Sequence, residues 1–237
     1  MSLTPAQRNQ LRKRAAKEAA ATAPAISMAG ATAYEQQLAQ LLQDRQRLKN
    51  VQSNQGKAEL KAQLIPAYEP YIQGVLAAGN GAQDEVLTTL MVWCIDAGLY
   101  QGALEIATYV IKHNMLMPDR FERSTGTLIA EEIANAALKA QKSGESFPLA
   151  IIEQAAALTA EQDMPDQARA KLHLALGKEN AAKAPDEQLT SAHIGYLVLA
   201  KAHLARAIDL HSNCGGKKDL ERVERLLKKH AAPPQAS

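Results

Sequence analysis

The chain has 237 residues, a formal net charge of +2 and only 4% aromatic residues. This length suffices for one or two domains with a buried core. No window alternates β-branched and polar residues as a strand does, so the sequence predicts an all-α protein. Two cysteines do not make a disulfide framework, and we find neither a secretion signal nor an apolar run long enough to cross a bilayer. We therefore expect a cytoplasmic protein that has no membrane partner.

Positive charge is concentrated towards the two ends of the chain. Before Tyr34, five basic residues stand against Glu18 alone, and from Gly215 onward six basic residues stand against three acidic ones. The basic residues are Arg8, Arg12, Lys13, Arg14 and Lys17 at one end and Lys217, Lys218, Arg222, Arg225, Lys228 and Lys229 at the other. Basic segments of this kind often bind polyanions, although a solvated helix face is the commoner reason for a single run of charge.

Residues 1–33 are predicted to form a basic, mobile N-terminal arm. A short helix can begin at Thr4-Pro5, but it has almost no apolar face to bury, and Pro24 and Gly30 interrupt the segment. We expect the arm to be mobile or to fold conditionally.

Residues 34–66 are predicted to form oligomerisation helices. The first helix, over 34–49, carries four leucines towards one side, and the second ends at Pro66. These leucines are Leu38, Leu41, Leu42 and Leu48. Because their seam is shorter than the roughly three or four heptads of an isolated coiled coil, the first helix must pack either on a neighbouring subunit or on the helices that follow.

Residues 67–180 are predicted to form a central helical domain, whose clearest part is a helical hairpin over 71–118. We expect Asn80-Gly81 to cap its first helix and Gly98 to end that helix. The order Trp93, Gly98, Tyr100, Ala103, Ala107 and Pro118 resembles a tetratricopeptide (TPR) helix pair. No further copies follow at a fixed period, so one irregular α-domain is an equally good interpretation.

The rest of the chain continues the multi-helix array. Helices are expected after Thr127, after Pro148 and over 166–176, and the last of these is expected to stop at Gly177. A hinge is expected over 179–186. Residues 181–230 are predicted to form a C-terminal helical hairpin with a basic last helix, and 231–237 a tail. In that last helix Lys218, Arg222, Arg225 and Lys229 recur at intervals of three or four and share one face, and Glu221 and Glu224 weaken their field.

The sequence supplies no catalytic, metal-binding or cofactor motif. Gly79-Asn80-Gly81 is not followed by the Lys-Ser or Lys-Thr of a phosphate loop. His193, His203 and His211 lie ten and eight residues apart, too far to stack two ligands within one helical turn. We therefore expect no ATPase, no metal and no cofactor.

Several spaced segments together resemble a phage family. These are 33–49, 81–118, 130–146 and 158–178, together with the Cys-Gly-Gly-Lys-Lys turn over 214–218. In this order they resemble the small terminase subunit of P-two-like tailed phages, also labelled the terminase endonuclease subunit. The resemblance covers about Thr4 to Lys178 and the basic end.

The resemblance implies a non-catalytic DNA-packaging adaptor that acts in the host cytoplasm. Such subunits bind the packaging (cos) site of concatemeric double-stranded phage DNA, assemble as homo-oligomeric rings and present the DNA to the large terminase subunit. We expect DNA contacts from the basic residues of the two ends, namely Arg8, Arg12, Lys13, Arg14, Lys17, Lys217, Lys218, Arg222, Arg225 and Lys229. Ring contacts are expected from the four leucines of 34–49. A TPR-like protein-interaction module with no DNA role and a true nuclease stay open as alternatives.

Overall fold

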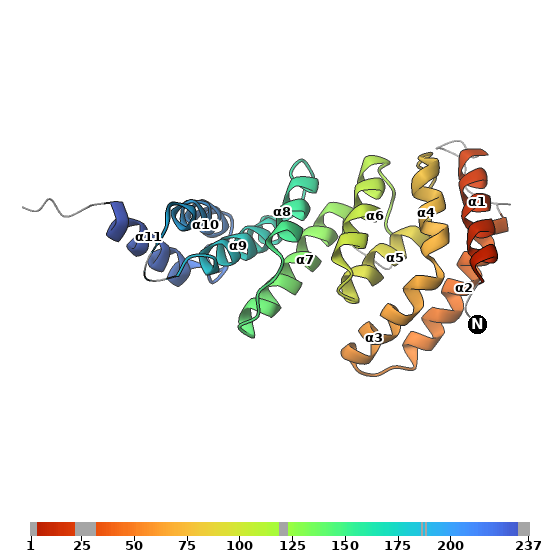
Figure 1. The fold of residues 1–237 in the computed structure, drawn as a ribbon, viewed down its shortest axis with the longest axis horizontal. Coiled ribbons are helices and arrows are strands. Elements are labelled where there is room, and N and C mark those ends of the chain that lie inside the picture. The colour runs from red at the N-terminus through yellow and green to blue at the C-terminus, as the bar shows by residue number, and fades with distance from the viewer. Residues whose placement is uncertain (1–3, 22–31, 119–122, 186, 188, 232–237) are drawn as a thin grey trace, which may run out of the picture. The chain divides into compact units, whose positions relative to one another are not determined.

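The computed structural model describes residues 4–21, 32–118, 123–185, 187 and 189–231. Within these residues the chain is entirely helical, and Figure 1 shows its helices in chain order. None of the helices described is long and apolar enough to span a membrane. The all-α prediction is therefore confirmed.

The chain divides into two compact units, residues 1–125 and 126–237. Unit 1 contains α1 (Pro5–Ala21), α2 (Thr32–Lys49), α3 (Asn54–Leu64), a 3-10 turn η1 (Ile65–Ala67), α4 (Glu69–Ala78), α5 (Glu85–Asp96) and α6 (Tyr100–Lys112). Unit 2 contains nearly all of α7 (Thr125–Lys142), followed by α8 (Leu149–Leu158), α9 (Asp166–Ala182), α10 (Ser191–Leu210) and α11 (Lys217–Ala231). The division falls inside the predicted central domain 67–180, so its two halves belong to different units.

In unit 1, a helix within the predicted arm lies against α4. The two helices α1 and α4 run side by side (Figure 1), and Ala15 of α1 is only 1% exposed. A Cβ placed on Gly74 of α4 would lie 2.7 Å from the main-chain oxygen of Arg12 and 2.8 Å from the Cβ of Ala15. The structure thus differs from the expected mobile arm because small residues, rather than large apolar ones, let the two backbones approach. Residues 22–31 lie outside the described part of the chain.

The hairpin predicted over 71–118 is present as α5 and α6, which pack on each other. Gly98 follows α5 with the left-handed φ of 76° that favours glycine. The N-cap of α5 is Asp84, not the expected Asn80-Gly81, because the Asp84 side chain accepts a hydrogen bond from the Leu87 amide. Trp93 packs edge-on against Tyr68 with 6.4 Å between ring centroids, and Ala103 and Ala107 of α6 are buried.

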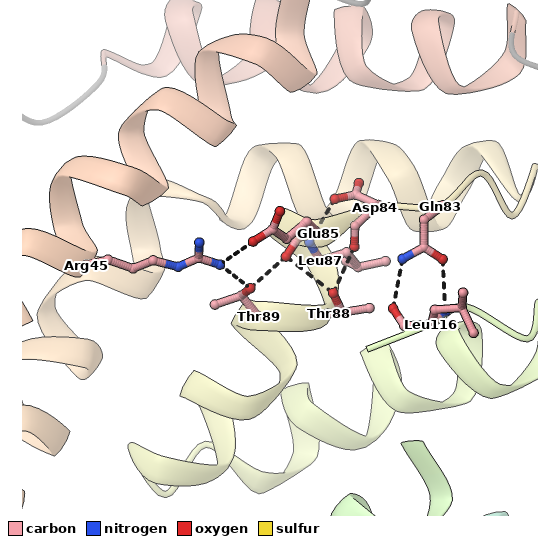
Figure 2. A network of polar contacts seen from close by, with 8 residues as sticks. All are labelled: Arg45, Gln83, Asp84, Glu85, Leu87, Thr88, Thr89 and Leu116. Atoms are coloured by element: carbon pink, nitrogen blue, oxygen red, sulfur yellow. Dashed lines mark hydrogen bonds and ion pairs between the residues drawn. The ribbon is translucent and has the colours of Figure 1, made fainter. Parts of the chain in front are cut away.

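A network of polar contacts surrounds the start of α5 (Figure 2). Asp84 is fully buried and accepts hydrogen bonds from the Tyr71 hydroxyl at 2.6 Å and the Leu87 amide at 2.9 Å. Burial raises the pKa of Asp84 to about 6, and these hydrogen bonds oppose the rise. Next to it, the Arg45 guanidinium of α2 donates to Glu85 at 2.7 Å and to Thr89 at 3.0 Å. The network joins α2, α4 and α5.

Unit 2 is built around the contact between α9 and α10. A Cβ placed on Gly177 would lie 2.6 Å from Cγ of Leu204, which is completely buried. The expected stop at Gly177 is therefore wrong, because this glycine lies inside α9 and provides room for α10. The core of the unit also includes Leu174, Leu197 and Val223.

The first part of the predicted hinge over 179–186 belongs to α9 as well. Glu179 is 1% exposed and accepts hydrogen bonds from Gln141 Nε2 at 3.1 Å, Ser146 Oγ at 3.1 Å and the Phe147 amide at 3.4 Å. These donors satisfy the buried carboxylate and tie α9 to α7 and to the segment after it.

Candidate nucleic-acid interface

The last helix, α11, exposes a row of basic side chains. Val223 and Leu226 pack into unit 2 and leave the opposite side of the helix in solvent. Lys218, Arg225 and Lys229 are exposed there. With about 100° of rotation and about 1.5 Å of rise per residue, they lie within an arc of roughly 40° around the helix and span about 16 Å along it. We call these three residues the α11 cation row. Lys217 and Lys228 are exposed beside it.

Two acidic residues of α11 form ion pairs with other helices of the same unit. Asp219 pairs with Lys178 of α9 at 2.6 Å, and Glu224 pairs with Lys201 of α10 at 3.0 Å. These lysines supply two positive charges close to α11. Lys201 neutralises Glu224 from another helix and so offsets the weakening of the basic face that the sequence predicts from this residue. Glu221, the other acid named there, is exposed beside the row and keeps its weakening effect.

Arg222 has a different environment from the other predicted DNA contacts of α11. It is half-buried, and its guanidinium donates to the main-chain oxygens of Ala181 and Ala184 at 3.5 and 3.4 Å. These carbonyls lie at the C-terminal end of α9, where a cation is favourable. Arg222 therefore fastens α11 to α9, and the exposed row remains for an external ligand.

The basic residues of α1 are divided in the same way. Arg8, Arg12, Lys13 and Lys17 are exposed, whereas Arg14 is half-buried and makes contacts within the protein. Arg8 and Arg12 line an open groove of about 450 Å³, whose other wall includes Pro66, Glu69 and Pro70. Arg12 also donates to Asn9 at 3.2 Å. The groove thus combines two guanidinium groups with one carboxylate.

The four predicted oligomerisation leucines of α2 do not share one environment. Leu41 and Leu48 are 0% and 8% exposed, because other helices of unit 1 cover them, and Leu38 is half-buried. Leu42 is 53% exposed. Of these four leucines, Leu42 is the one most available to a neighbouring subunit.

The buried acids are held by hydrogen bonds from neighbouring side chains and amides. Asp44 is 1% exposed and accepts hydrogen bonds from Tyr68, Gln40 and Arg47 at 2.8 to 3.0 Å, and Asp84 and Glu179 are satisfied by internal donors as described above. Within the described ranges, no three His, Cys, Asp or Glu residues are placed to hold a metal ion. These carboxylates have structural roles.

Two histidines meet between α9 and α10. The Nδ1 atoms of His173 and His203 lie 3.0 Å apart, so one ring must donate and the other accept. Burial, followed by the neighbouring His203 and the charges of Arg206 and Arg169, lowers the pKa of His173 to about 4. The pKa of His203 is also lowered, mainly by burial. At neutral pH the pair is uncharged and joins the two helices.

Comparison with known proteins identifies the family. Residues 38–167 match the family described as phage small terminase subunit. The chain belongs to this family. It is also 40% identical over 235 residues to the "Terminase, endonuclease subunit" of Escherichia phage P2, a match that covers 99% of this chain and 90% of that protein. No solved structure matches.

The family match confirms the resemblance noted in the sequence, and it places the α11 cation row beyond the matched region 38–167. Sequence reasoning found the row from its helical spacing but missed Lys178 and Lys201. No local signal marks these two lysines, because they meet α11 only after α9, α10 and α11 have packed together.

Proposed function

We propose that this chain is the DNA-recognition subunit of a phage terminase. It binds the packaging (cos) site of concatemeric viral DNA in the host cytoplasm and presents it to the large ATPase and nuclease subunit, without catalysing cleavage itself. The observation that supports this most directly is the α11 cation row: Asp219 and Glu224 beside it are paired with lysines, and Glu221 is the exposed acid that remains next to it. Exposed basic side chains with this spacing suit phosphates, which supply most of the affinity in sequence-independent contacts.

Four exposed residues of α1, Arg8, Arg12, Lys13 and Lys17, form the second proposed contact. They add positive charge in unit 1, whereas Arg14 and Arg222 position helices. Both sets of contacts act on the DNA backbone, so they set affinity and orientation and do not by themselves select a sequence.

The α5–α6 hairpin is proposed to be a TPR-like scaffold. Trp93 and the buried Ala103 and Ala107 support this, because small residues on α6 allow close approach of the neighbouring helix. We further propose that copies assemble into a ring and that Leu42 of α2 contributes to the contact. A ring would repeat the α11 cation row around an axis and raise the local density of positive charge.

The test is the salt dependence of DNA binding by the variant Lys218→Gln/Arg225→Gln/Lys229→Gln. If all three side chains neutralise phosphates, the slope of log K against log salt becomes shallower by about 2.7 units. Fluorescence anisotropy with phage DNA at several salt concentrations measures this slope. The matched control is Lys112→Gln/Lys142→Gln/Lys183→Gln, which removes the same charge from exposed positions outside α11.

If the control variant makes the slope shallower by as much as the α11 variant does, the effect comes from overall charge and not from the α11 cation row. If instead the wild-type protein does not bind DNA at low salt, the proposal is wrong and the protein-interaction alternative takes its place.

A further inference from the structure

Helix α10 exposes an apolar face. Val198 and Leu199 are 54% and 48% exposed, among the largest exposures of aliphatic side chains in the described residues. Ala192, Gly195 and Ala202 are exposed on the same side, since residues three, four and seven apart share a helix face. We call these five residues the α10 seam. An exposed helix face in water normally carries polar side chains, so the seam is a candidate interface.

The charges of α10 are distributed unevenly along this side of the helix. Over 191–200 its exposed residues are Ser191 and the first four members of the seam, none of them charged. The half from 201 onward exposes Lys201, Arg206 and Asp209. Lys201 is paired with Glu224, which lies on α11 of the same unit.

We infer that the α10 seam binds the α10 seam of a second copy of this chain, with the two helices antiparallel. A parallel pair would place Arg206 beside its own copy and bring like charges together. In an antiparallel pair the contact covers residues 192–202 of each helix, and Arg206 and Asp209 of each copy project beyond it. Such a two-fold contact needs a self-complementary surface.

The seam is also complementary to itself in shape. If the two-fold axis passes near residue 197, Leu199 of one copy faces Gly195 of the other and Ala192 faces Ala202. A Cβ added to Gly195 would meet nothing within 4 Å, so the position has room for the partner's leucine. Small residues opposite large ones allow the helices to approach closely, as ridges fit into grooves. This contact differs from the ring contact proposed through Leu42, and it does not depend on DNA binding.

Disulfide trapping tests the orientation. In a Cys214→Ser background, with Cys94 buried, we introduce Val198→Cys or Ala202→Cys. With a rise of about 1.5 Å per residue, two copies of residue 198 are offset by about 3 Å along the helix, but two copies of residue 202 by about 15 Å. Since a disulfide requires Cα atoms within about 7 Å, mild oxidation should trap the Val198→Cys dimer at least about tenfold faster.

A mixed sample supplies the matched control. Chains with Ala192→Cys and chains with Ala202→Cys should trap each other, while neither traps itself. Trapping of Ala202→Cys with itself would show a parallel pair, and absence of trapping for Val198→Cys would show that something other than a second α10 covers the seam. Either result overturns the inference.

Native mass separates this contact from the proposed ring. Val198→Asp/Leu199→Asp should halve the assembly mass, and its DNA-binding salt slope should stay that of the wild type. Leu42→Asp tests the ring contact alone. An unchanged mass for the α10 double variant contradicts the α10 pairing, whatever the outcome for Leu42 or for DNA.

Discussion

Units 1 and 2 each bring two helices together at a glycine, but they bury different polar groups. Unit 1 joins α1 to α4 at Gly74 and buries Asp84 beside Tyr71. Unit 2 joins α9 to α10 at Gly177 and holds the His173–His203 pair at the same helix contact. The comparison shows that unit 1 buries a group whose pKa is raised, whereas unit 2 buries a group whose pKa is lowered.

The two units should therefore respond to acid in opposite directions. The pKa of Asp84 is raised to about 6, so the stability linked to Asp84 is fully present below its unfolded pKa and is lost as the pH rises through 6. The pKa of His173 is lowered to about 4, so the stability linked to His173 is present above its unfolded pKa and is lost as the pH falls towards 4.

The largest expected effect is that of Asp84→Asn. With a folded pKa of about 6 and an unfolded pKa of about 3.9, wild-type Asp84 makes unit 1 more stable at pH 4 than at pH 7 by roughly 2 kcal/mol. Asparagine can still cap α5 but does not titrate, so this pH dependence disappears. The measurement is hydrogen-exchange protection of the Leu87 and Leu90 amides from pH 4 to 7.

The control for this variant is Glu105→Gln, at an exposed position of α6 in the same unit. It should keep the wild-type pH profile. Parallel profiles for Asp84→Asn and wild type would show that Asp84 does not bind the proton.

The next effect compares the two glycine contacts. Gly74→Ala should destabilise unit 1 by about 1–3 kcal/mol, because the new Cβ meets main-chain atoms and Ala15, which cannot rotate away. Gly177→Ala should cost less, since its closest contacts are Leu204 side-chain atoms and alanine gains up to about 1 kcal/mol of helix propensity. Denaturant unfolding measures both losses, and hydrogen exchange of α1 amides for Gly74→Ala and of α10 amides for Gly177→Ala assigns each loss to its unit.

Gly102→Ala is the control for these substitutions. Gly102 lies in α6 with nothing within 4 Å of an added Cβ, so this variant should be stabilised by about 0.5–1 kcal/mol. Equal losses at Gly74 and Gly177 would contradict the distinction between main-chain and side-chain neighbours.

The smallest effect is that of His173→Gln, because His173 is only half-buried. Glutamine keeps a hydrogen-bonding group at this contact but does not titrate, so unit 2 should lose less stability between pH 7 and pH 5 than the wild type. Exchange of the Leu204 amide reports on this unit, and His230→Gln at an exposed site of α11 is the control. An unchanged acid response would show that His173 takes up its proton equally in the folded and unfolded states, which contradicts the lowered pKa.

The sequence was most informative where the signals were local. The hairpin of α5 and α6, the left-handed Gly98 and the shared face of α11 follow from spacing and turn residues within a few positions. The roles of Gly74 and Gly177 did not follow, because a glycine needed for a close helix contact looks in sequence like a helix breaker. Its partners, Arg12 and Leu204, are more than twenty residues away.

The candidate interface was predictable to a similar extent. Helical spacing placed Lys218, Arg225 and Lys229 together, but it could not separate them from Arg222, whose partners are carbonyls at the end of α9. Likewise, Leu41 and Leu42 are adjacent in the sequence, and only the packing of unit 1 determines which is buried. Charge and hydrophobicity identify candidates, and tertiary contacts decide which are available.

The amide of Gln83 has a consequence for how the hairpin forms. It donates to the main-chain oxygen of Leu116 at 2.8 Å and accepts from the Leu116 amide at 2.9 Å (Figure 2). These two bonds close the segment that contains α5 and α6 by joining residues 33 positions apart. Because the entropy of closing a loop grows slowly with its length and local contacts form fastest, we expect this closed segment to form early in folding, before α2 and α4 assemble on it.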